Sequence, residues 1–433
     1  MTVLDYVKRV AHHTPNKAAI VAKDVTLTYN ELHQMMSRCE PLPIPLLGDS
    51  WEGDFCLYTT GTTGQSKGVV ISQEAVIANS ENLIEAHGYT DDTVFIITGP
   101  MDHLGCWSKI FPTLMQGGTL VILPDGMRDL NAFFDAIEHY RGHKVATFLV
   151  PVSIRIILQM DKERLGALGD TIDFIETGAA PMMHSDMLQL CELLPHTRLY
   201  NTYASTETGI VASYNYNDGR CKPGCTGLPL RHSNIIITPE GKIACSGKTL
   251  MTRYKNEPAS SFSPVPVTNF PSKIRGGQGA LTTAPVPSPS PWEGRGGVAT
   301  VPGASASAFF ITNDNGYLDE DGMLHVTGRD DDIINVGGLK VSPIEIEELA
   351  MTYPGIRECI CIPQEHRLLG FVPKLLCVIQ EGSSFNAKAI HRFMSERLEA
   401  YKVPQVYQAV EHIEKTFNGK INRKKYRITK TTP

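Results

Sequence analysis

The chain has 433 residues, of which 42% are hydrophobic and 20% are charged, and its formal net charge at pH 7 is −6. This length is too great for a single compact core, so two or three domains are expected. The composition is typical of a globular protein, and the negative charge gives no support to nucleic-acid binding. No apolar run reaches the roughly 18 residues of a membrane span, and no signal-peptide core opens the chain. We therefore expect no membrane span and a cytoplasmic protein.

Ten cysteines are scattered along the chain and do not form the regular spacing of a disulfide framework. Those in alternating apolar runs, such as Cys359 and Cys361, are predicted to be buried free thiols. A zinc site built from Cys221, Cys225 and His232 is an alternative for three of these side chains. No second cysteine pair completes that ligand set.

The first 38 residues predict a helix end, a strand and a further helix. The segment from Thr14 to Val21 reads as a capped helix end that leads into a strand. Thr28 is placed to cap a helix that begins near Tyr29, and Glu31 completes a capping box.

From residue 54 to residue 200, strand-like and helix-like segments alternate. This alternation indicates a mostly parallel sheet with helices on its faces. Ligands of such sheets bind at the carboxyl ends of the strands, where we place the 59–68 loop and the 177–181 turn. The predicted strands are Val94–Ile97, Leu120–Leu123, Ala146–Val150 and Ile172–Ile175. The predicted helices are Glu74–Ala86, Cys106–Met115, Leu130–Tyr140, Ser153–Met160 and Met182–Leu194.

The second half of the chain begins with β-like runs between residues 235 and 257. Residues 258–308 are then rich in Pro, Ser, Gly and Ala without a helical or strand period, so we predict a disordered insertion into a surface loop. A partner-binding segment is the alternative. A small α+β unit is predicted after Asp332, and we set the domain boundary near Arg329–Asp332. Its predicted elements are helices at Pro343–Thr352 and Ala387–Glu399 and strands at Glu358–Ile362 and Leu375–Ile379.

The stretch from Thr59 to Val70 combines glycines, hydroxyl groups and a lysine at high density. Glycines let backbone N–H groups approach an anion, hydroxyls donate to phosphate oxygens, and Lys67 adds a mobile positive charge. It is not a Walker A loop, because Ser66 stands where glycine is required and Gly68 where Ser or Thr is required. We predict a polyphosphate site, with a plain surface turn as the alternative. Its predicted binding residues are Thr59, Thr60, Gly61, Thr62, Thr63, Gly64 and Lys67.

This loop resembles that of the acyl-adenylate-forming, or AMP-binding, superfamily, and most of all that of acyl- and aryl-CoA ligases. The resemblance implies a large mixed α/β N-terminal domain, with mostly parallel sheets and a β subdomain, and a small α+β C-terminal lid. We assign residues 1–328 to the large domain, including the 258–308 insertion, 329–332 to a hinge and 333–433 to the lid. A short link from Pro41 to Phe55 stands where the family has a long segment, so the N-terminal subdomain is shortened.

Two further motifs resemble the family's nucleotide site. The first, made of Gly178, Ala179, Ala180 and Pro181, resembles the family turn that holds the adenine and the acyl group. The second runs from Tyr203 through Ala204 and Ser205 to Glu207, with Ala204 in place of the usual glycine. The resemblance implies that Tyr203 stacks on adenine, Thr206 bonds a phosphate oxygen and Glu207 holds Mg²⁺. An ordinary helix start is the alternative for the Thr-Glu pair.

Five more positions complete the resemblance. Asp314 and Arg329 match the pair that bonds the ribose hydroxyls, with an acid-rich hairpin turn as the alternative. Asp331 matches the family's hinge residue. Lys420, in a Gly-Lys-Ile context, would reach between the carboxylate and the α-phosphate, although a solvated basic tail is the alternative. Gly338 lies in a loop that would line the thiol tunnel.

The segment from Pro100 to Gly105 bears on the class of substrate acid. It resembles the corresponding segment of CoA ligases, and this resemblance implies that His103 lies near the substrate carboxylate. A structural histidine at a helix start is the alternative. Amino-acid-activating relatives have an aspartate where Leu104 stands here. A buried ammonium group without a counter-ion is costly, so an acid without an amino group is favoured. Asp102 keeps the amino-acid alternative open.

The implied reaction is ATP-dependent activation of a carboxylic acid to acyl-AMP, with pyrophosphate release, followed by transfer to a thiol, for which coenzyme A is favoured. The cofactors would be ATP, Mg²⁺ and coenzyme A. The alternatives are an amino-acid-adenylating enzyme that loads a phosphopantetheinyl carrier protein, or a degenerate nucleotide-binding relative. The identity of the acid (fatty, aromatic or succinylbenzoate-like) and the oligomeric state, a homodimer included, are left open.

Overall fold

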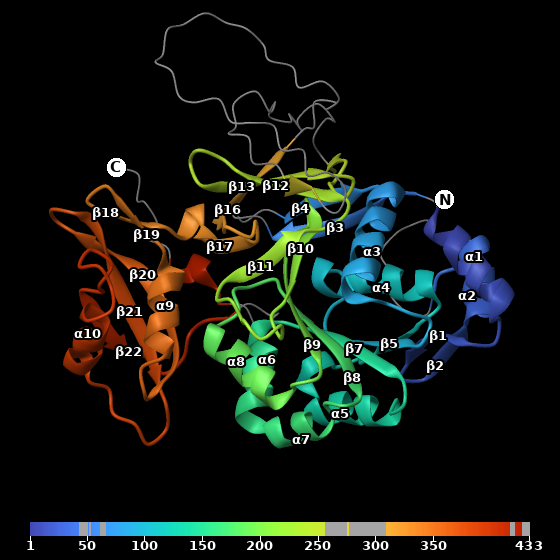
Figure 1. Cartoon of the computed structure of the whole chain (residues 1–433), viewed down its shortest axis with the longest axis horizontal. Coiled ribbons are helices and arrows are strands. Elements are labelled where there is room, and N and C mark those ends of the chain that lie inside the picture. The colour runs from blue at the N-terminus through green and yellow to red at the C-terminus, as the bar shows by residue number, and fades with distance from the viewer. Residues whose placement is uncertain are drawn as a thin grey trace, which may run out of the picture.

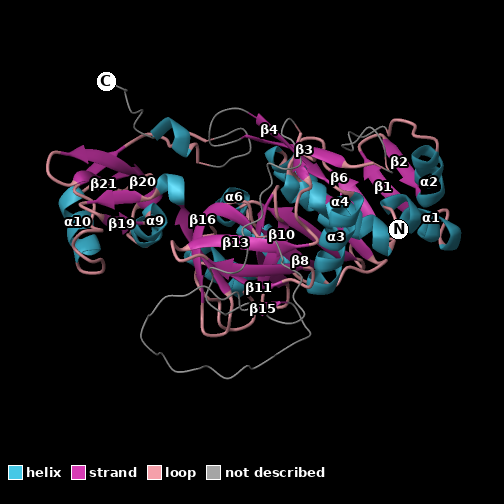
Figure 2. Cartoon of the chain, turned by 90° about the horizontal axis from the view of Figure 1, so that it is seen from above, coloured by secondary structure: helices cyan, strands magenta, loops and turns pink. Residues whose placement is uncertain are grey.

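A computed structural model describes residues 1–42, 51, 53–60, 66–255, 275–276, 309–415 and 421–426 of the chain. The strands form a fourteen-stranded sheet, a three-stranded sheet and a five-stranded sheet. Figure 1 shows that the five-stranded sheet and its helices form a separate unit beside the rest, and the view from above agrees (Figure 2). The mixed α/β architecture that the sequence predicts is confirmed.

The first half of the large sheet is parallel. Five neighbouring pairs run parallel, and only β2 (Val25–Thr28), at the edge, runs against its neighbour. The predicted strands of this region are all present. In spatial order the parallel strands are β1 (Ala18–Ala22), β6 (Thr119–Ile122), β5 (Thr93–Ile97), β7 (Lys144–Leu149), β8 (Ile172–Thr177) and β9 (Arg198–Ser205).

Helices cover both faces of this parallel region. Along β5, Phe95 and Ile97 belong to one apolar core, whereas Val94 and Ile96 belong to the other, so the strand is buried on both sides. The first core is covered by α1 (Val3–His13), α2 (Tyr29–Ser37), α3 (Gln73–His87) and α4 (Leu104–Gln116). The second is covered by α5 (Leu130–His139), α6 (Pro151–Met160), α7 (Lys162–Ala167) and α8 (His184–Leu193), which follow a short turn, η1 (Gly126–Arg128). None of the helices in the described part has the length and apolar character needed to cross a membrane.

Helix α2 begins as the sequence predicts. The hydroxyl of Thr28 accepts from the backbone N–H of Glu31 at 3.3 Å, and the backbone N–H of Thr28 donates to the Glu31 carboxylate at 2.8 Å. This reciprocal pair satisfies two of the N–H groups that a helix start leaves without an intrahelical partner.

The second half of the large sheet is antiparallel. Within the predicted insertion, residues 275–276 form the short strand β15 and pair with β12, so the prediction of disorder is wrong for these two residues. The rest of 258–308 lies outside the described residues. The strands of this half are β10 (Gly209–Asn215), β11 (Cys225–Pro229), β12 (Ser233–Ile237), β13 (Lys242–Gly247), β15 (Arg275–Gly276), β16 (Phe310–Leu318) and β17 (Leu324–Arg329).

The predicted phosphate loop belongs to the three-stranded sheet. Strands β3 (Phe55–Thr60) and β4 (Ser66–Ile71) form an antiparallel hairpin, and β14 (Arg253–Tyr254) pairs with the outer side of β4. The loop therefore does not follow a strand of the parallel sheet, and the predicted placement at the carboxyl end of such a strand is wrong. The 177–181 turn does follow β8, as predicted.

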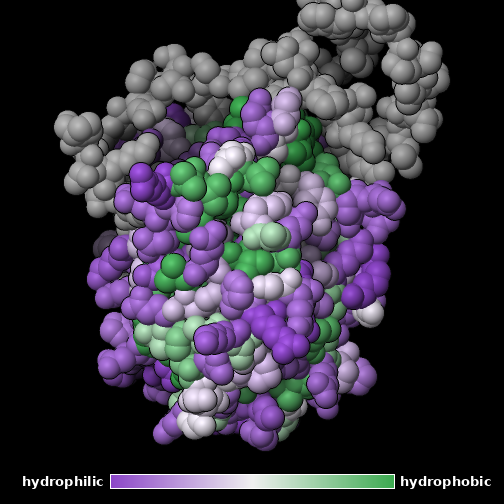
Figure 3. All heavy atoms as spheres, turned by 90° about the vertical axis from the view of Figure 1, so that its left-hand side faces the viewer, coloured by the Kyte–Doolittle hydropathy of each residue, from purple (hydrophilic) through white to green (hydrophobic). Residues whose placement is uncertain are grey.

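The small unit follows the short helix η4 (Asp330–Asp332) and has its own apolar core. Its outer face, toward the viewer in Figure 3, is mostly hydrophilic, with apolar side chains scattered between polar ones. The domain limits given above, 1–328, 329–332 and 333–433, remain predictions. The elements of this unit are β18 (Ile334–Val336), β19 (Leu339–Val341), α9 (Pro343–Met351), β20 (Ile356–His366), β21 (Gly370–Ile379), α10 (Ala387–Ser395), β22 (Val406–Ala409) and η5 (Arg423–Tyr426).

A buried ionic group ties the small unit to the segment before it. The Arg423 guanidinium pairs with the carboxylate of Glu347 on α9, and its Nε lies 3.9 Å from Oδ2 of Asp332 on η4. The backbone N–H of Cys361 donates to the other Glu347 oxygen at 2.7 Å. Burial raises the pKa of Glu347, and Arg423 opposes that rise. Arg423 therefore joins three elements that are distant in sequence.

We predict that Arg423→Met destabilises the small unit by about 3 kcal/mol, because Glu347 is then left buried without a cation. Chemical denaturation followed by circular dichroism measures the loss. Lys425→Met is the matched control, since the Lys425 side chain is 57% exposed and pairs with a surface carboxylate, Glu414. Equal stability of the two variants would contradict the assignment.

Candidate nucleotide site

Three of the predicted segments follow parallel strands of the large sheet. The segment with His103 follows β5, the Gly178 turn follows β8, and the turn with Thr206 and Glu207 follows β9. The carboxyl ends of parallel strands meet at one edge of a sheet, which is where such sheets bind ligands. The topology therefore brings the predicted acid and nucleotide segments to the same edge.

Two glycines let these segments meet at Phe148, near the end of β7. A Cβ atom at Gly105 would lie 2.6 Å from the Phe148 ring. At Gly178, a Cβ atom would lie 2.7 Å from the Thr202 hydroxyl oxygen and 3.7 Å from the same ring. Neither position has space for a side chain. The sequence did not single out Phe148, because it reads as one more apolar residue of a buried strand.

The turn after β8 has a strained backbone at one residue. Ala179 has a φ of +67°, in the left-handed region that costs a residue with a Cβ atom on the order of 1 kcal/mol. The Thr202 hydroxyl lies 3.0 Å from the carbonyl oxygen of Thr177 and supports the start of the turn. The predicted residues Ala180 and Pro181 complete the segment before α8 begins at His184.

A second cluster joins the predicted adenine and ribose residues. The Tyr203 hydroxyl lies 2.8 Å from Oδ2 of Asp314 and 3.2 Å from the hydroxyl of Thr312. Arg329 faces Asp314 across the β16–β17 pair, and its Nε lies 3.7 Å from Oδ1. Burial raises the pKa of Asp314, whereas Arg329 and Tyr203 act to lower it. The carboxylate and the half-exposed guanidinium together suit a group with neighbouring hydroxyls.

A third cluster joins the phosphate hairpin to the turn after β9. The Lys67 ammonium lies 4.6 Å from the centre of the Tyr254 ring, and the Tyr254 hydroxyl donates to Oε1 of Glu207 at 3.2 Å. In the hairpin register, Lys67 lies directly opposite Thr59. The lysine and the predicted metal ligand therefore share one tyrosine. The sequence did not predict Tyr254, whose only signal was its place before the Pro-rich segment.

Backbone bonds hold this third cluster in place. The N–H of Met251 donates to the carbonyl of Glu207 at 2.8 Å, and the N–H of Lys255 donates to that of Gly68 at 2.7 Å. Between them, the N–H of Thr252 donates to the carbonyl of Val70 at 2.8 Å. One five-residue segment therefore connects the hairpin to the β9–β10 turn.

The Tyr203–Glu207 motif ends in a β-turn and not in a helix. Residues 206–208 form the turn between β9 and β10, so the helix-start alternative is wrong. The Ser205 backbone N–H donates to the hydroxyl of Thr208 at 3.1 Å, which closes the turn. Ala204 and Thr206 are both partly buried.

His103 stands directly before the first residue of α4. Its Nδ1 lies 2.6 Å from Oδ1 of Asp102. Asp102, the carboxylate that could pair with the ammonium group of an amino-acid substrate, is therefore next to an imidazole.

Gly338, predicted to line a thiol tunnel, lies in the β18–β19 turn of the small unit and donates its N–H to the Asn335 side chain at 2.8 Å. The backbone of Thr60 is described but its side chain is not. Outside the described residues lie Gly61, Thr62, Thr63, Gly64 and Lys420.

The alternative zinc ligands have other partners. His232 Nε2 lies 2.6 Å from a Glu81 carboxylate oxygen, and the Cys225 sulfur lies 3.7 Å from that of Met323. Within the part of the chain that the structure covers, no group of three His, Cys, Asp or Glu side chains is arranged to hold a metal.

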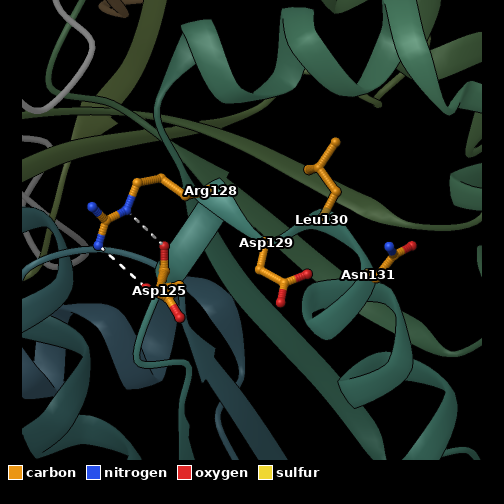
Figure 4. A pocket seen from close by; sticks show the side chains of 5 residues that line it. All are labelled: Asp125, Arg128, Asp129, Leu130 and Asn131. Atoms are coloured by element: carbon orange, nitrogen blue, oxygen red, sulfur yellow. Dashed lines mark hydrogen bonds and ion pairs between the residues drawn. The ribbon is translucent and has the colours of Figure 1, made fainter.

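An open surface depression of about 490 Å³ lies beside η1 and the start of α5 (Figure 4). Its only cationic lining side chain, Arg128, pairs with Asp125, and Asp129 caps the helix by accepting from the N–H of Ala132 at 3.0 Å. Two carboxylates and a paired guanidinium do not suit a polyphosphate. None of its lining residues was predicted as a site residue.

Family models match two parts of the chain. The one described as AMP-binding enzyme matches residues 50–254, and the one described as AMP-binding enzyme C-terminal domain matches residues 345–420. Together they include the hairpin, the Gly178 turn and the Tyr203–Glu207 motif.

The chain is similar to curated CoA ligases. It is 24% identical to oxalate–CoA ligase of Arabidopsis thaliana, over 86% of this chain and 66% of that protein. It is 26% identical to indoleacetate–CoA ligase of Aromatoleum aromaticum, over 84% of this chain and 65% of that protein. The chain thus spans slightly less than two thirds of the length of these relatives.

A solved structure has the same fold over nearly the whole chain. O-succinylbenzoate coenzyme A synthetase from Bacillus subtilis, in complex with AMP, superposes with a TM-score of 0.72 at 18% identity and covers 98% of each chain. With the motifs in the family's order and both family models matched, the chain belongs to the AMP-binding enzymes of the acyl-adenylate-forming superfamily.

Proposed function

We propose that this protein activates a carboxylic acid with ATP, releases pyrophosphate, and transfers the acyl group from acyl-AMP to the thiol of coenzyme A. The observation that carries the proposal is the Lys67–Tyr254–Glu207 contact, which unites the phosphate hairpin with the predicted metal ligand. The names of the curated relatives, which are CoA ligases, support coenzyme A as the acceptor.

Each residue has a role in positioning or charge stabilisation. Asp314 and Arg329 hold the ribose hydroxyls, and Lys67 and Lys420 balance charge on the phosphates. His103 orients the acid so that a carboxylate oxygen attacks the α-phosphorus while the bond to pyrophosphate breaks. In the second step the thiol sulfur attacks the acyl carbon, AMP leaves, and the thiol proton is released.

The surroundings of Glu207 suit its proposed role as a Mg²⁺ ligand. Tyr254 donates to one carboxylate oxygen only, so lone pairs remain on both oxygens for a cation. Mg²⁺ is commonly held by one or two carboxylates together with substrate phosphates. When bound at Glu207, the ion would offset the negative charge of the phosphates.

The acid is best described as one without an amino group. Leu104 leaves the position of the ammonium partner apolar, and Asp102 is already next to His103. The relatives named for oxalate and for indoleacetate act on very different acids, so the acid itself stays open. Loading of a carrier protein, cytoplasmic location and homodimer formation stay predictions.

ATP–pyrophosphate exchange across a panel of dicarboxylic, aromatic, fatty and amino acids tests the proposal. Exchange with an acid that lacks an amino group, followed by thioester formation with coenzyme A, is the expected result. Exchange with amino acids alone would favour the carrier-loading alternative, and ATP binding without any exchange would favour the degenerate relative.

We predict that Lys420→Ala abolishes acyl-AMP formation and spares thiol transfer from supplied acyl-AMP, because its charge is needed at the α-phosphate only in the first step. Pyrophosphate release and thioester formation are measured separately. Lys415→Ala, whose lysine pairs with Glu358 at 2.9 Å, is the control. Equal loss of both steps would count against the role.

We predict a graded effect at Tyr254. Tyr254→Phe keeps the ring beside Lys67 and loses the bond to Glu207, so the rate of acyl-AMP formation should fall about 10-fold, the value of one net hydrogen bond. Tyr254→Ala should cost more, since the ring is also lost. Tyr317→Phe, at a half-exposed tyrosine on β16, should leave the rate unchanged. A Tyr254→Ala rate equal to that of the Phe variant would contradict a role for the ring.

We predict that Arg329→Gln makes AMP binding more sensitive to acid. Burial already raises the pKa of Asp314, and Arg329 lowers it, so loss of the guanidinium raises that pKa further. Only the ionised carboxylate accepts from both ribose hydroxyls. Calorimetric titration against pH should show affinity lost at a higher pH in the variant. An unchanged pH midpoint for the loss of AMP affinity would contradict the coupling between Arg329 and Asp314. Arg392→Gln, at an exposed helix position, is the control.

A further inference from the structure

A fully buried ion pair joins helix α4 to the sheet behind the candidate site. The Lys109 ammonium on α4 lies 2.5 Å from Oε1 of Glu176 on β8, and the two side chains are 0% and 1% exposed. Lysine and glutamate are almost never this deeply buried unless they are paired. Because desolvation offsets much of the attraction, a buried pair is weak grounds for a role in stability alone. The proposed mechanism assigns neither residue a role.

Lys109 fixes the helix that begins directly after His103. Its ammonium lies 5.4 Å from the centre of the Phe148 ring, and Phe148 is the neighbour of Glu176 in the β7–β8 register. One turn earlier, Gly105 rests on the same ring. Lys109 is six residues after His103, or about 9 Å along the helix. The contacts of Lys109 and Gly105 with Phe148 therefore fix the position of the N-terminal end of α4, next to His103, relative to the sheet.

Glu176 connects the same pair to the nucleotide side. The Thr202 hydroxyl lies 3.1 Å from Oε1 of Glu176 and 3.0 Å from the carbonyl oxygen of Thr177, and its one proton serves either acceptor. Thr202 also lies against Gly178 and directly precedes Tyr203. The carboxylate thus contacts the residue that supports both nucleotide segments.

His87 closes the other side of this group. Its Nε2 lies 2.9 Å from the Ser213 hydroxyl, its ring stacks on Tyr200, and its Nδ1 lies 3.4 Å from Oε2 of Glu176. Burial lowers the pKa of His87, and Glu176 acts in the opposite direction. Burial acts to raise the pKa of Glu176, but Lys109 and His87 together outweigh it, so the pKa is lowered and the carboxyl stays ionised. Lys109 is therefore its counter-ion.

We propose that Lys109 and Glu176 are positioning residues for acid activation, which hold the His103 end of α4 and the Gly178–Tyr203 segments at one fixed separation. The inference rests on the proposed function, in which a carboxylate must meet the α-phosphorus. Reacting atoms must approach to roughly 3–3.5 Å, and a displacement of about 1 Å can cost on the order of 100-fold in rate. A rigid pair behind both segments supplies that alignment.

The test is the double variant Lys109→Met/Glu176→Gln, which removes both charges together and keeps the side-chain lengths. It should fold and bind ATP with wild-type affinity, because Lys67, Asp314 and Arg329 are untouched. Its kcat for pyrophosphate release should fall about 100-fold at an unchanged KM for ATP. Thioester formation from supplied acyl-AMP, in which the acid and nucleotide are already joined, should change less than about 3-fold.

Two further variants keep the test decisive. Arg155→Met/Asp186→Asn removes another partly buried ion pair, between α6 and α8, and should leave kcat per folded enzyme unchanged. Thr202→Val cuts the link to Glu176 with both charges intact and should show the same split between the two steps. It serves in place of the double variant if that protein does not fold.

A wild-type kcat for pyrophosphate release, or an equal loss in both steps, would overturn the positioning role. A wild-type enzyme without exchange for any acid would instead overturn the proposed function, and this inference with it. The two failures are distinguishable, because positioning is judged on the ratio of variant to wild type.

Discussion

The candidate site depends on the backbone bonds that the five residues from Met251 to Lys255 make on both sides. One end of this segment bonds to Glu207, and the other end bonds along β4 to Val70 and Gly68. These bonds join the hairpin directly to the β9–β10 turn, although the two belong to different sheets. Backbone groups make such bonds whatever the side chain, so Tyr254 is the part of the segment that adds specific chemistry.

Buried charge recurs where elements that are distant in sequence need one geometry. Arg423 and Glu347 join η5, α9 and the segment before the small unit, and Lys109 and Glu176 join α4 to β8. Removing a charge from water costs several kcal/mol even when it is paired, so such groups are weak sources of stability. Their value lies in direction: an ion pair with hydrogen bonds allows few arrangements, whereas an apolar contact tolerates sliding.

The helices and strands of the parallel sheet were predictable because their patterns are local. Apolar runs of strand length between amphipathic segments predicted β5 to β8, and the Thr28–Glu31 spacing predicted the start of α2. The errors occurred where the partner is remote. Nothing near Ser66 shows that it begins a strand whose outer neighbour, β14, comes far later in the chain, and two residues of β15 are too short to show a period.

The sequence by itself determined the order and spacing of the nucleotide motifs, and therefore the family, the α/β architecture and the residues expected at the phosphate and the ribose. Only the tertiary structure showed that the predicted acid and nucleotide segments meet at Phe148, that Tyr254 joins Lys67 to Glu207, and that Lys109 and Glu176 lie behind them. The reason is physical. A motif is recognised from residues that are adjacent in the chain, whereas these roles arise from contacts between residues that only folding brings within a few ångströms.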